Sequence, residues 1–506
     1  IARNQMVFTS LEDSISEDNS VRFVDAFVEN IDLKALGFEL QMLKTEGRPS
    51  FSTQTFLKIY LYGYLNGLRS SRKLEKECVR NIELQWLLFG LVPNYHSISD
   101  FRKNNPSGLK KLFKVFVSFL KDADLIAGET IAIDGTKSRA HNSKKANFNQ
   151  KKIDKHLAYI EEKTQQYLDE LAQNDEKENS TTITKIQEKI ERLKKNKLRY
   201  EVLEEKLKAS GEPQISTTDE DSRALLVQGQ VVEVSYNIQA AVDDRYNLVV
   251  ATHTINRNDR NALSAIAIEA KGNLGVETFT ALVDKGYHNG REITQCKEQN
   301  IITIVAHPDQ GKSNENGTQP DYFVSKFIYN TDDDTYICPA NQVLKTTGRW
   351  HKKTRDRDSY DFKKYRTPAC KECPVKSLCT SRTGGREIDR SQYADAVAEN
   401  NQRYQANALL YRKRQEINEH IFGTIKRQWG YNHTNLTGLE KVNGEHSLIM
   451  LVYNIKRAIN ILGVPELIAK LKNWKSPYKA KTCFVFRQTC FAFILAPLEN
   501  TLSIAA

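Results

Sequence analysis

Apolar residues recur at helical spacing in the first quarter of the chain. Between residues 51 and 125 they repeat at steps of three and four, and serines at positions 70, 71, 97 and 99 interrupt the repeat. Apolar residues at this period line one face of a helix, and serine commonly caps the start of a new one. The pattern therefore predicts several short helices packed as a bundle.

Basic residues accompany this predicted bundle. A bundle with exposed cations can place a helix in a DNA groove, but an ordinary bundle with solvated basic edges gives the same pattern. Spacing alone does not choose between the two interpretations. The cations concerned are Arg72, Lys73, Arg102, Lys103, Lys110 and Lys111.

Short β-rich runs alternate with helical stretches from residue 129 to residue 306. The run 129–136 predicts a buried strand with Asp134 at its end, and two further runs predict a β-hairpin over 232–255. A helix at 261–271 precedes a strand at 278–283, which delivers Asp284. A helix at 290–299 and a strand at 301–306 complete a mixed α/β pattern.

The remaining segments differ in character. Residues 142–211 are rich in Lys and Glu, and two apolar stripes with a break at 174–182 predict a helical hairpin. Such an arm could dimerise, lie along DNA or simply be solvated. Residues 308–390 are predicted to form a loop-rich segment with a cysteine cluster. A long helix over 391–429 and a helical region over 444–471 follow.

Three carboxylates can meet in this arrangement. Asp134 and Asp284 follow strands, and Glu419 lies on the predicted helix 391–429, on one face with Arg412, Glu416, Gly423 and Lys426. Carboxylate oxygens suit Mg²⁺ or Mn²⁺, and two such ions about 3.5–4 Å apart can activate the attacking oxygen of a phosphodiester cleavage and stabilise the leaving one. Taken singly, each position is an ordinary turn or surface residue; their order within the α/β pattern favours a site.

The composition of the chain indicates the kind of partner it binds and the redox compartment in which it works. The 506 residues predict two to four domains, and 40% apolar with 27% charged residues is typical of a soluble globular protein. A net charge of +11 favours a polyanion such as nucleic acid. Because no apolar run reaches the roughly 18–20 residues of a membrane span, we expect no membrane partner. The eight cysteines, without an export signal, favour metal binding over disulfides.

Four of these cysteines lie in the loop-rich segment. They are spaced as Cys-x2-Cys and then Cys-x5-Cys, with one distant upstream member. Four thiolates satisfy tetrahedral Zn²⁺, which would supply folding energy that a small core lacks; four unrelated free thiols are the alternative. The four are Cys338, Cys370, Cys373 and Cys379.

Several short motifs occur together in order. Ile133-Asp134-Gly135-Thr136, Val283-Asp284-Lys285-Gly286-Tyr287 and Glu419-His420-Ile421-Phe422-Gly423-Thr424-Ile425-Lys426 surround the three acids. Further pieces are Gly67 to Arg72, Ser97 to Arg102, Thr218 to Arg223, Tyr236-Asn237-Ile238-Gln239, Asn258-Asp259 and Tyr453-Asn454. This ordered set resembles the DDE transposases of bacterial insertion sequences, in the group with a Tyr-x2-Arg-x3-Glu-x6-Lys signature, a helical insertion and a cysteine cluster.

The chain departs from that signature at one place. Position 415, four residues before Glu419, is Gln, and Tyr411 and Arg414 keep their mutual spacing one residue early. Glu419 is preferred over Glu416 because only Glu419 is followed by Phe-Gly and by a Lys at the required distance.

The resemblance implies a fold and a reaction. It implies a ribonuclease H-like α/β core, a mixed sheet flanked by helices. It also implies metal-dependent cleavage at transposon ends, followed by attack of the freed 3′-hydroxyl on target DNA. Asp134, Asp284 and Glu419 would hold Mg²⁺ or Mn²⁺. The residues expected to contact double-stranded DNA are Arg72, Arg102, Tyr411, Arg414, Lys426 and Trp429, although a Trp such as Trp429 is more typical of a protein core than of a base-stacking site.

These expectations divide the chain into parts. An N-terminal helical DNA-binding domain (1–125) precedes a core formed by 126–141 and 212–307. A helical hairpin (142–211) and a cysteine-rich segment (308–390) interrupt this core. Residues 391–471 complete it, and 472–506 form a tail of unknown role. The resemblance further implies a cytoplasmic, nucleoid-associated bacterial protein that acts as a homodimer. The rival hypotheses are a domesticated, inactive DNA-binding protein and a zinc-dependent regulator.

Overall fold

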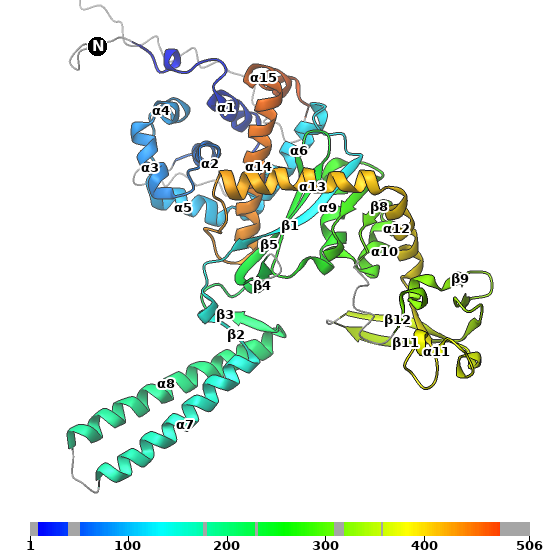
Figure 1. Ribbon diagram of the computed structural model, residues 1–506. Helices are drawn as coiled ribbons and strands as arrows, with labels where there is room; N and C mark the ends of the chain where they lie inside the picture. Colours follow the sequence, from blue (N-terminus) through cyan, green and yellow to red (C-terminus); the bar gives the residue numbers. More distant parts are fainter. Residues whose placement is uncertain are drawn as a thin grey trace, which may run out of the picture.

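A computed structural model describes residues 9–38, 51–175, 180–227, 231–307, 318–355 and 358–475. Figure 1 shows a central body from which two smaller parts project, a long helical arm and a β-rich module. The tail beyond residue 475, with its apolar segment 483–497, lies outside the described residues.

The N-terminal part is helical, as predicted. Asparagine or serine side chains cap several of these helices: Asn19, Ser52, Asn81 and Asn94 each accept a hydrogen bond from a first-turn backbone N–H. The helices bury an aromatic core. They are α1 (Ser20–Asn30), α2 (Thr53–Leu65), α3 (Ser71–Arg80), α4 (Ile82–Leu88), α5 (Tyr95–Asn104) and α6 (Pro106–Asp122).

A six-stranded mixed sheet forms the centre of the body, which confirms the mixed α/β prediction. Its order is β4-β5-β1-β7-β8, with β6 also paired to β5. Strand β5 runs antiparallel to β1 and to β6, whereas β7 runs parallel to β1 and to β8. The strands are β1 (Thr130–Arg139), β4 (Arg223–Val227), β5 (Val231–Asp243), β6 (Val249–Ile255), β7 (Phe279–Val283) and β8 (Ile301–Val305).

Helices cover this sheet. Helix α13 crosses over β1 in Figure 1, while α9 and α14 contact β6 and α12 contacts β8. The helices are α9 (Leu263–Leu274), α10 (Gly290–Glu298), α12 (Ala394–Ala406), α13 (Ala408–Gly423), α14 (Leu439–Leu462) and α15 (Val464–Asn473). Among the described residues no single helix is long and apolar enough to span a membrane; only α14 and α15 together pass that test, and a 108° bend separates them.

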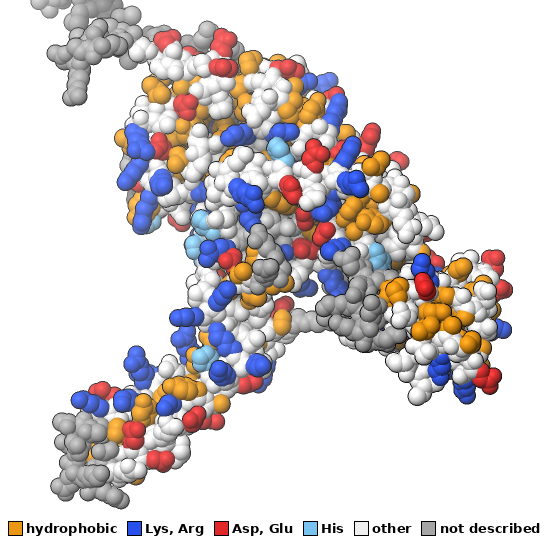
Figure 2. Space-filling model, viewed as in Figure 1, with side chains coloured by type: hydrophobic (Ala, Val, Ile, Leu, Met, Phe, Trp, Pro, Cys, Tyr) orange, Lys and Arg blue, Asp and Glu red, His pale blue; other side chains and the backbone are white. Residues whose placement is uncertain are grey.

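The arm consists of α7 (Gln150–Asp175) and α8 (Ser180–Ser210), so the predicted pair of helices is present. The short strands β2 (Asn147–Asn149) and β3 (Gln214–Ser216) pair at its base. A small apolar cluster closes that end, with Phe148, Ile153 and Leu203 at its centre. Figure 2 shows many Lys and Arg side chains along the visible face of the arm.

The segment predicted to be loop-rich instead contains a five-stranded antiparallel sheet, so that prediction was wrong. Its order is β13-β12-β11-β10-β9. The long strands of this sheet carry many Lys, Arg and Thr residues and few apolar ones, so they lack the alternation that marks a strand in sequence. The strands are β9 (Ile328–Asn330), β10 (Thr335–Ile337), β11 (Val343–Arg355), β12 (Asp358–Arg366) and β13 (Glu387–Ser391).

Two further boundaries differ from prediction. Strand β1 continues five residues past Asp134, because the long antiparallel strand β5 pairs with it as far as Arg139. The helix expected over 391–429 is broken at Asn407 and ends in a π-helical turn, η9 (Thr424–Gln428).

A buried ionic cluster joins the N-terminal helices to α14. Glu445, fully buried on α14, accepts a hydrogen bond from Arg69 Nη2 at 2.7 Å and lies 3.7 Å from Arg102 Nη1. Arg102 also donates to the Tyr64 hydroxyl at 2.7 Å and is 5% exposed. The prediction that Arg102 is exposed was therefore wrong, because its guanidinium neutralises a buried carboxylate.

Candidate active site

Asp134 and Asp284 occupy equivalent positions on neighbouring parallel strands. The β1–β7 register runs from Thr130 opposite Thr280 to Ile133 opposite Val283. The next residue in each case is an aspartate: Asp134 lies within β1, and Asp284 directly follows the end of β7. Adjacent strands lie about 4.8 Å apart, so the register alone brings the two carboxylates close together. Asp284 also caps the turn η4 (Lys285–Tyr287) by accepting from the Gly286 N–H.

A guanidinium bridges the two carboxylates. Arg414 on α13 places Nη1 3.4 Å from Asp134 Oδ2 and Nη2 3.3 Å from Asp284 Oδ1. The Arg414 side chain is 15% exposed, and it stacks over the ring of Tyr411, 5.6 Å from the ring centroid. Both aspartates therefore converge on one cationic group, which is the arrangement a cation-binding pair requires.

The electrostatics of Asp134 also favour a cation. Burial raises the pKa of this carboxyl to about 6, the Gly135 N–H and Arg414 lower it, and the nearby carboxylates of Asp284 and Asp259 raise it further. Desolvation and the neighbouring negative charges both destabilise the ionised form of Asp134. A positive group placed between the carboxylates offsets both effects.

Glu419 lies elsewhere on α13. It is exposed, and its Oε1 accepts from Gln415 Nε2 at 3.1 Å, one turn earlier on the helix. Glu416 is exposed as well. Within the described part of the chain, no group of three or more His, Cys, Asp or Glu side chains is arranged to hold a metal ion. The structure thus brings together Asp134, Asp284 and Arg414, and leaves Glu419 on the solvent side of the same helix.

Lys426 reaches the site's strand through the π-helical turn. Its Nζ donates to Thr136 Oγ1 at 3.1 Å and to the Lys137 carbonyl at 3.0 Å, and burial lowers its pKa. π-Helical turns inside α-helices commonly occur at functional sites, since the wider turn redirects the side chains after it. This turn separates Lys426 from the exposed face of Glu419, so Lys426 does not share the helical face predicted for it with Arg412, Glu416, Glu419 and Gly423.

The other predicted DNA contacts are scattered. Arg72 on α3 is exposed, with its guanidinium 5.1 Å from the centre of the Tyr95 ring. Trp429 is half-buried and packs against Tyr431 and Tyr453, which agrees with its alternative interpretation as a core residue.

A set of polar residues beside the two aspartates was not assigned a role from the sequence. Asp259, in the turn η3 (Asp259–Asn261), accepts hydrogen bonds from Asn237 and Gln239 on β5, and Lys137 on β1 lies beside it. The motifs that contain Asn237, Gln239 and Asp259 are part of the family resemblance. That resemblance was the only sequence feature that pointed to these residues.

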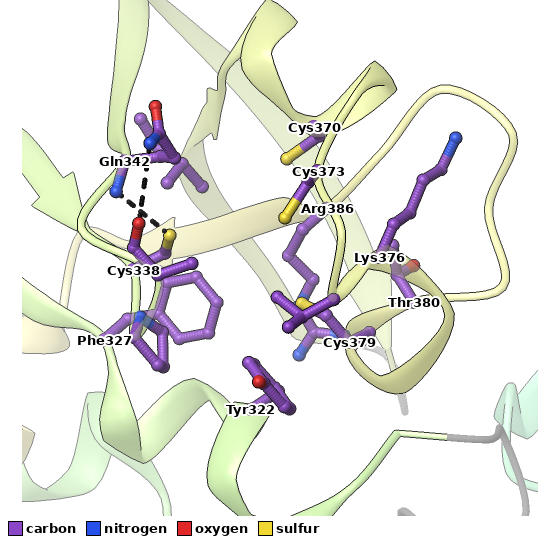
Figure 3. Close-up of a pocket in the computed structure, with 14 residues that line it drawn as sticks. Tyr322, Phe327, Cys338, Gln342, Cys370, Cys373, Lys376, Cys379, Thr380 and Arg386 are labelled. Carbon is purple, nitrogen blue, oxygen red and sulfur yellow. Dashed lines mark hydrogen bonds between the residues drawn. The ribbon is translucent and has the colours of Figure 1, made fainter.

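The four cysteines of the β-rich module line one pocket. Figure 3 shows Cys370 and Cys373 side by side, with Cys338 and Cys379 on other walls of the same pocket. Cys338 Sγ accepts from the Gln342 N–H at 3.3 Å. Burial raises the pKa of the Cys379 thiol, and the other three thiols add to that rise. The fold therefore gathers side chains that are up to 41 positions apart in sequence, from Cys338 to Cys379.

Comparison with known proteins gives two matches. A family model described as a transposase DDE domain matches residues 337–459, and one described as a transposase domain (DUF772) matches residues 9–104. The first match includes Arg414, Glu419 and Lys426, whereas Asp134 and Asp284 lie outside both. No curated protein and no solved structure matches the chain.

Proposed function

Because the two matched domains indicate a DDE transposase of an insertion sequence, we propose that the chain cleaves DNA at the ends of its element and joins the freed 3′-hydroxyls to target DNA. The observation that carries this proposal is the convergence of Asp134 and Asp284, at matching positions of two parallel strands, on one cation.

The sheet supports a ribonuclease H-like core. In it, β6, β5 and β1 are antiparallel neighbours, and β1, β7 and β8 run parallel. The carboxyl end of β7, the neighbouring part of β1 and the helix α13 meet at the two aspartates. In this interpretation residues 142–211 and 308–390 are insertions into the core.

DDE transposases generally use divalent metals such as Mg²⁺. The residues present fit such an ion, because the Arg414 guanidinium already stands in for a cation between the carboxylates of Asp134 and Asp284. Bound there, Mg²⁺ or Mn²⁺ would supply activation of the attacking oxygen and stabilisation of the leaving one. Asp134 and Asp284 would hold the ion, and Glu419 is the residue we propose as their third partner, although its side chain faces solvent on α13 in this structure.

The remaining basic residues would act on the DNA backbone. Freed from the aspartates, Arg414 can pair with a phosphate, since a guanidinium binds phosphate oxygens in the same forked geometry as carboxylates. Lys426 lies beside β1 at Thr136, close to the proposed cleavage site. Arg72 is exposed on the N-terminal helices, which we propose as a second surface that contacts DNA. We further propose a homodimer on double-stranded DNA, with one subunit at each end of the element.

A cleavage assay tests this function. We expect the full chain to release 3′-hydroxyl ends from a duplex carrying the element's own terminal sequence in Mg²⁺ or Mn²⁺, and to release none in a chelator. Specific binding of this duplex without any cleavage in either metal would contradict the proposal and support a domesticated DNA-binding protein or a zinc-dependent regulator instead.

We also propose that Cys338, Cys370, Cys373 and Cys379 hold one structural Zn²⁺. All four side chains line one pocket of a module whose apolar core is small, with Phe327, Leu344 and Tyr365 among its members. The four thiols are not arranged as a metal-binding group in this structure, so tetrahedral ligation would require them to close around the ion. A site closed in this way would contribute folding energy to the module.

Elemental analysis checks the zinc proposal. Purified protein should contain about one zinc per chain, and Cys370→Ser combined with Cys373→Ser should remove it and lower the melting temperature. Ser381→Ala, an exposed position in the same segment, should change neither quantity. Absence of zinc from the wild type, with an unaltered melting temperature in the cysteine variant, would eliminate the site.

A further inference from the structure

We propose that Asp259 is a positioning residue for the two aspartates, acting through the buried amides of Asn237 and Gln239. This inference rests on the proposed function, because the site it supports is the proposed cleavage site. Asp259 lies in η3, after β6, and its Oδ1 accepts from Asn237 Nδ2 at 2.7 Å and from Gln239 Nε2 at 3.0 Å.

One end of this network supports Asp134. In the β1–β5 register Gly135 lies opposite Gln239 and Lys137 opposite Asn237, so these side chains share one side of the sheet. A Cβ atom at Gly135 would lie closer than 3.0 Å to polar atoms of Gln239, Asp259 and Asn237. The glycine beside Asp134 therefore lets the polar network of Asn237, Gln239 and Asp259 pack directly against the strand that carries the Asp134 carboxylate.

The other end supports Asp284. Tyr287 closes the turn η4 that Asp284 caps, is 1% exposed, and donates its hydroxyl to Gln239 Oε1. The Cβ position of Gly286, in the same turn, lies 4.0 Å from Asp259 Cβ. Gln239 thus connects the Asp284 turn, through Tyr287, to the Asp259 carboxylate.

The burial of the Asn237 and Gln239 side chains makes the Asp259 carboxylate hard to replace as their hydrogen-bond acceptor. Asn237 and Gln239 are both 0% exposed, so their amide N–H groups depend on protein acceptors. Asn237 Nδ2 also donates to the Arg257 carbonyl, and its buried Oδ1 has no hydrogen-bond partner among the described residues. If the Asp259 side chain loses its negative charge, its hydrogen bonds from Asn237 and Gln239 weaken and its ion pair with Lys137 is lost, so both aspartate-bearing segments lose part of a common support.

The contacts favour positioning over direct metal binding. Asp259 Oδ1 already accepts two amide hydrogen bonds, and Lys137 Nζ lies 3.4 Å from both carboxylate oxygens. Asp134 and Asp284, by contrast, share the Arg414 guanidinium. Asp259 is therefore saturated by neighbours that orient it toward β5 rather than toward the cation.

The test compares Asp259→Asn with Asp244→Asn, a matched change just beyond the C-terminal end of β5, in the full chain. Two quantities are measured: the rate of end cleavage on prebound DNA, and the Mn²⁺ concentration that gives half of the metal-induced rise in melting temperature. Loss of a residue that orients a metal ligand typically costs about 10–100-fold in metal affinity or activity. We expect shifts of that size for Asp259→Asn, unchanged DNA affinity, and no shift for Asp244→Asn.

Tyr287→Phe provides the second variant, since it removes only the hydroxyl at the far end of the network. We expect a smaller loss of cleavage, and a double variant with Asp259→Asn no worse than Asp259→Asn alone, because both act through Gln239. Additive losses, wild-type behaviour of Asp259→Asn, or a complete loss of Mn²⁺ response equal to that of Asp134→Asn would each overturn the positioning role. If the wild type neither cleaves DNA nor changes its melting temperature in Mn²⁺, the proposed function fails. If the wild type does not cleave but its melting temperature rises in Mn²⁺, the Mn²⁺ concentration for half of that rise still tests the positioning role of Asp259.

Discussion

Replacing Asp134 or Asp284 by Asn should lower end cleavage by roughly a thousandfold or more while leaving specific DNA binding almost unchanged. A metal ion contributes several kcal/mol of transition-state stabilisation to phosphodiester cleavage, and each 1.36 kcal/mol is a factor of about ten in rate. Asn keeps the size of the side chain but lacks the negative charge on which Arg414 now converges. Single-turnover cleavage and equilibrium DNA binding, measured on the same duplex, separate the two effects.

Glu419 and Glu416 form a matched pair for the third position. Both are exposed on α13, three residues apart. We expect Glu419→Gln to abolish cleavage as the aspartate variants do and Glu416→Gln to leave it intact. Cleavage that survives in Glu419→Gln but disappears in Glu416→Gln would show that the third ligand was wrongly chosen.

Glu445→Ala should destabilise the chain by about 3–5 kcal/mol, because removal of one partner leaves buried charges without compensation. Glu445 Oε1 accepts from Arg69, its Oε2 accepts from the Leu436 N–H at 3.1 Å, and Arg102 lies beside it. Urea unfolding measures the loss. Glu440→Ala, an exposed change on the same helix, should stay within about 0.5 kcal/mol of the wild type.

The pH dependence of stability offers a check on the same cluster. Burial alone would raise the pKa of Glu445, but Arg102 and Arg69 lower it from 4.5 to about 2. Because the folded-state pKa is depressed, this stabilisation is complete above pH 4.5 and is lost as the pH falls toward 2. The Glu445→Ala variant should lose less stability over that interval than the wild type; equal losses would show that the cluster contributes little.

Elements with strong periodicity could be predicted from the sequence, and elements stabilised by distant partners could not. The strands around Ala241 and Leu282 are continuous apolar runs, and the helices of the N-terminal part carry clear apolar faces. The sheet of residues 328–391 was missed because its core depends on a few side chains, such as Leu344 and Tyr365, spread over polar strands.

The candidate site shows the same division. Asp134 and Asp284 could be found because each follows an apolar run, and the β1–β7 register then brings them together. The burial of Arg102 could not be predicted, because the basic residues around it in sequence give no sign of its partner Glu445, which lies on a helix near the other end of the chain. Asp259 could be noticed as part of a motif, but its role depends on Gly135, Asn237, Gln239 and Tyr287, which converge only in the folded chain.

The contact between Arg69 and Glu445 has a consequence for synthesis on the ribosome. The two residues are 376 positions apart. At a synthesis rate of about 5–20 residues per second, Glu445 is therefore made roughly 20–75 s after Arg69. During that interval Arg69 and Arg102 have no carboxylate to neutralise them, and the surface that will receive α14 stays open. A product truncated by a premature stop codon before Glu445 would therefore keep this surface exposed permanently and become a substrate for chaperones and proteases rather than a stable partial fold.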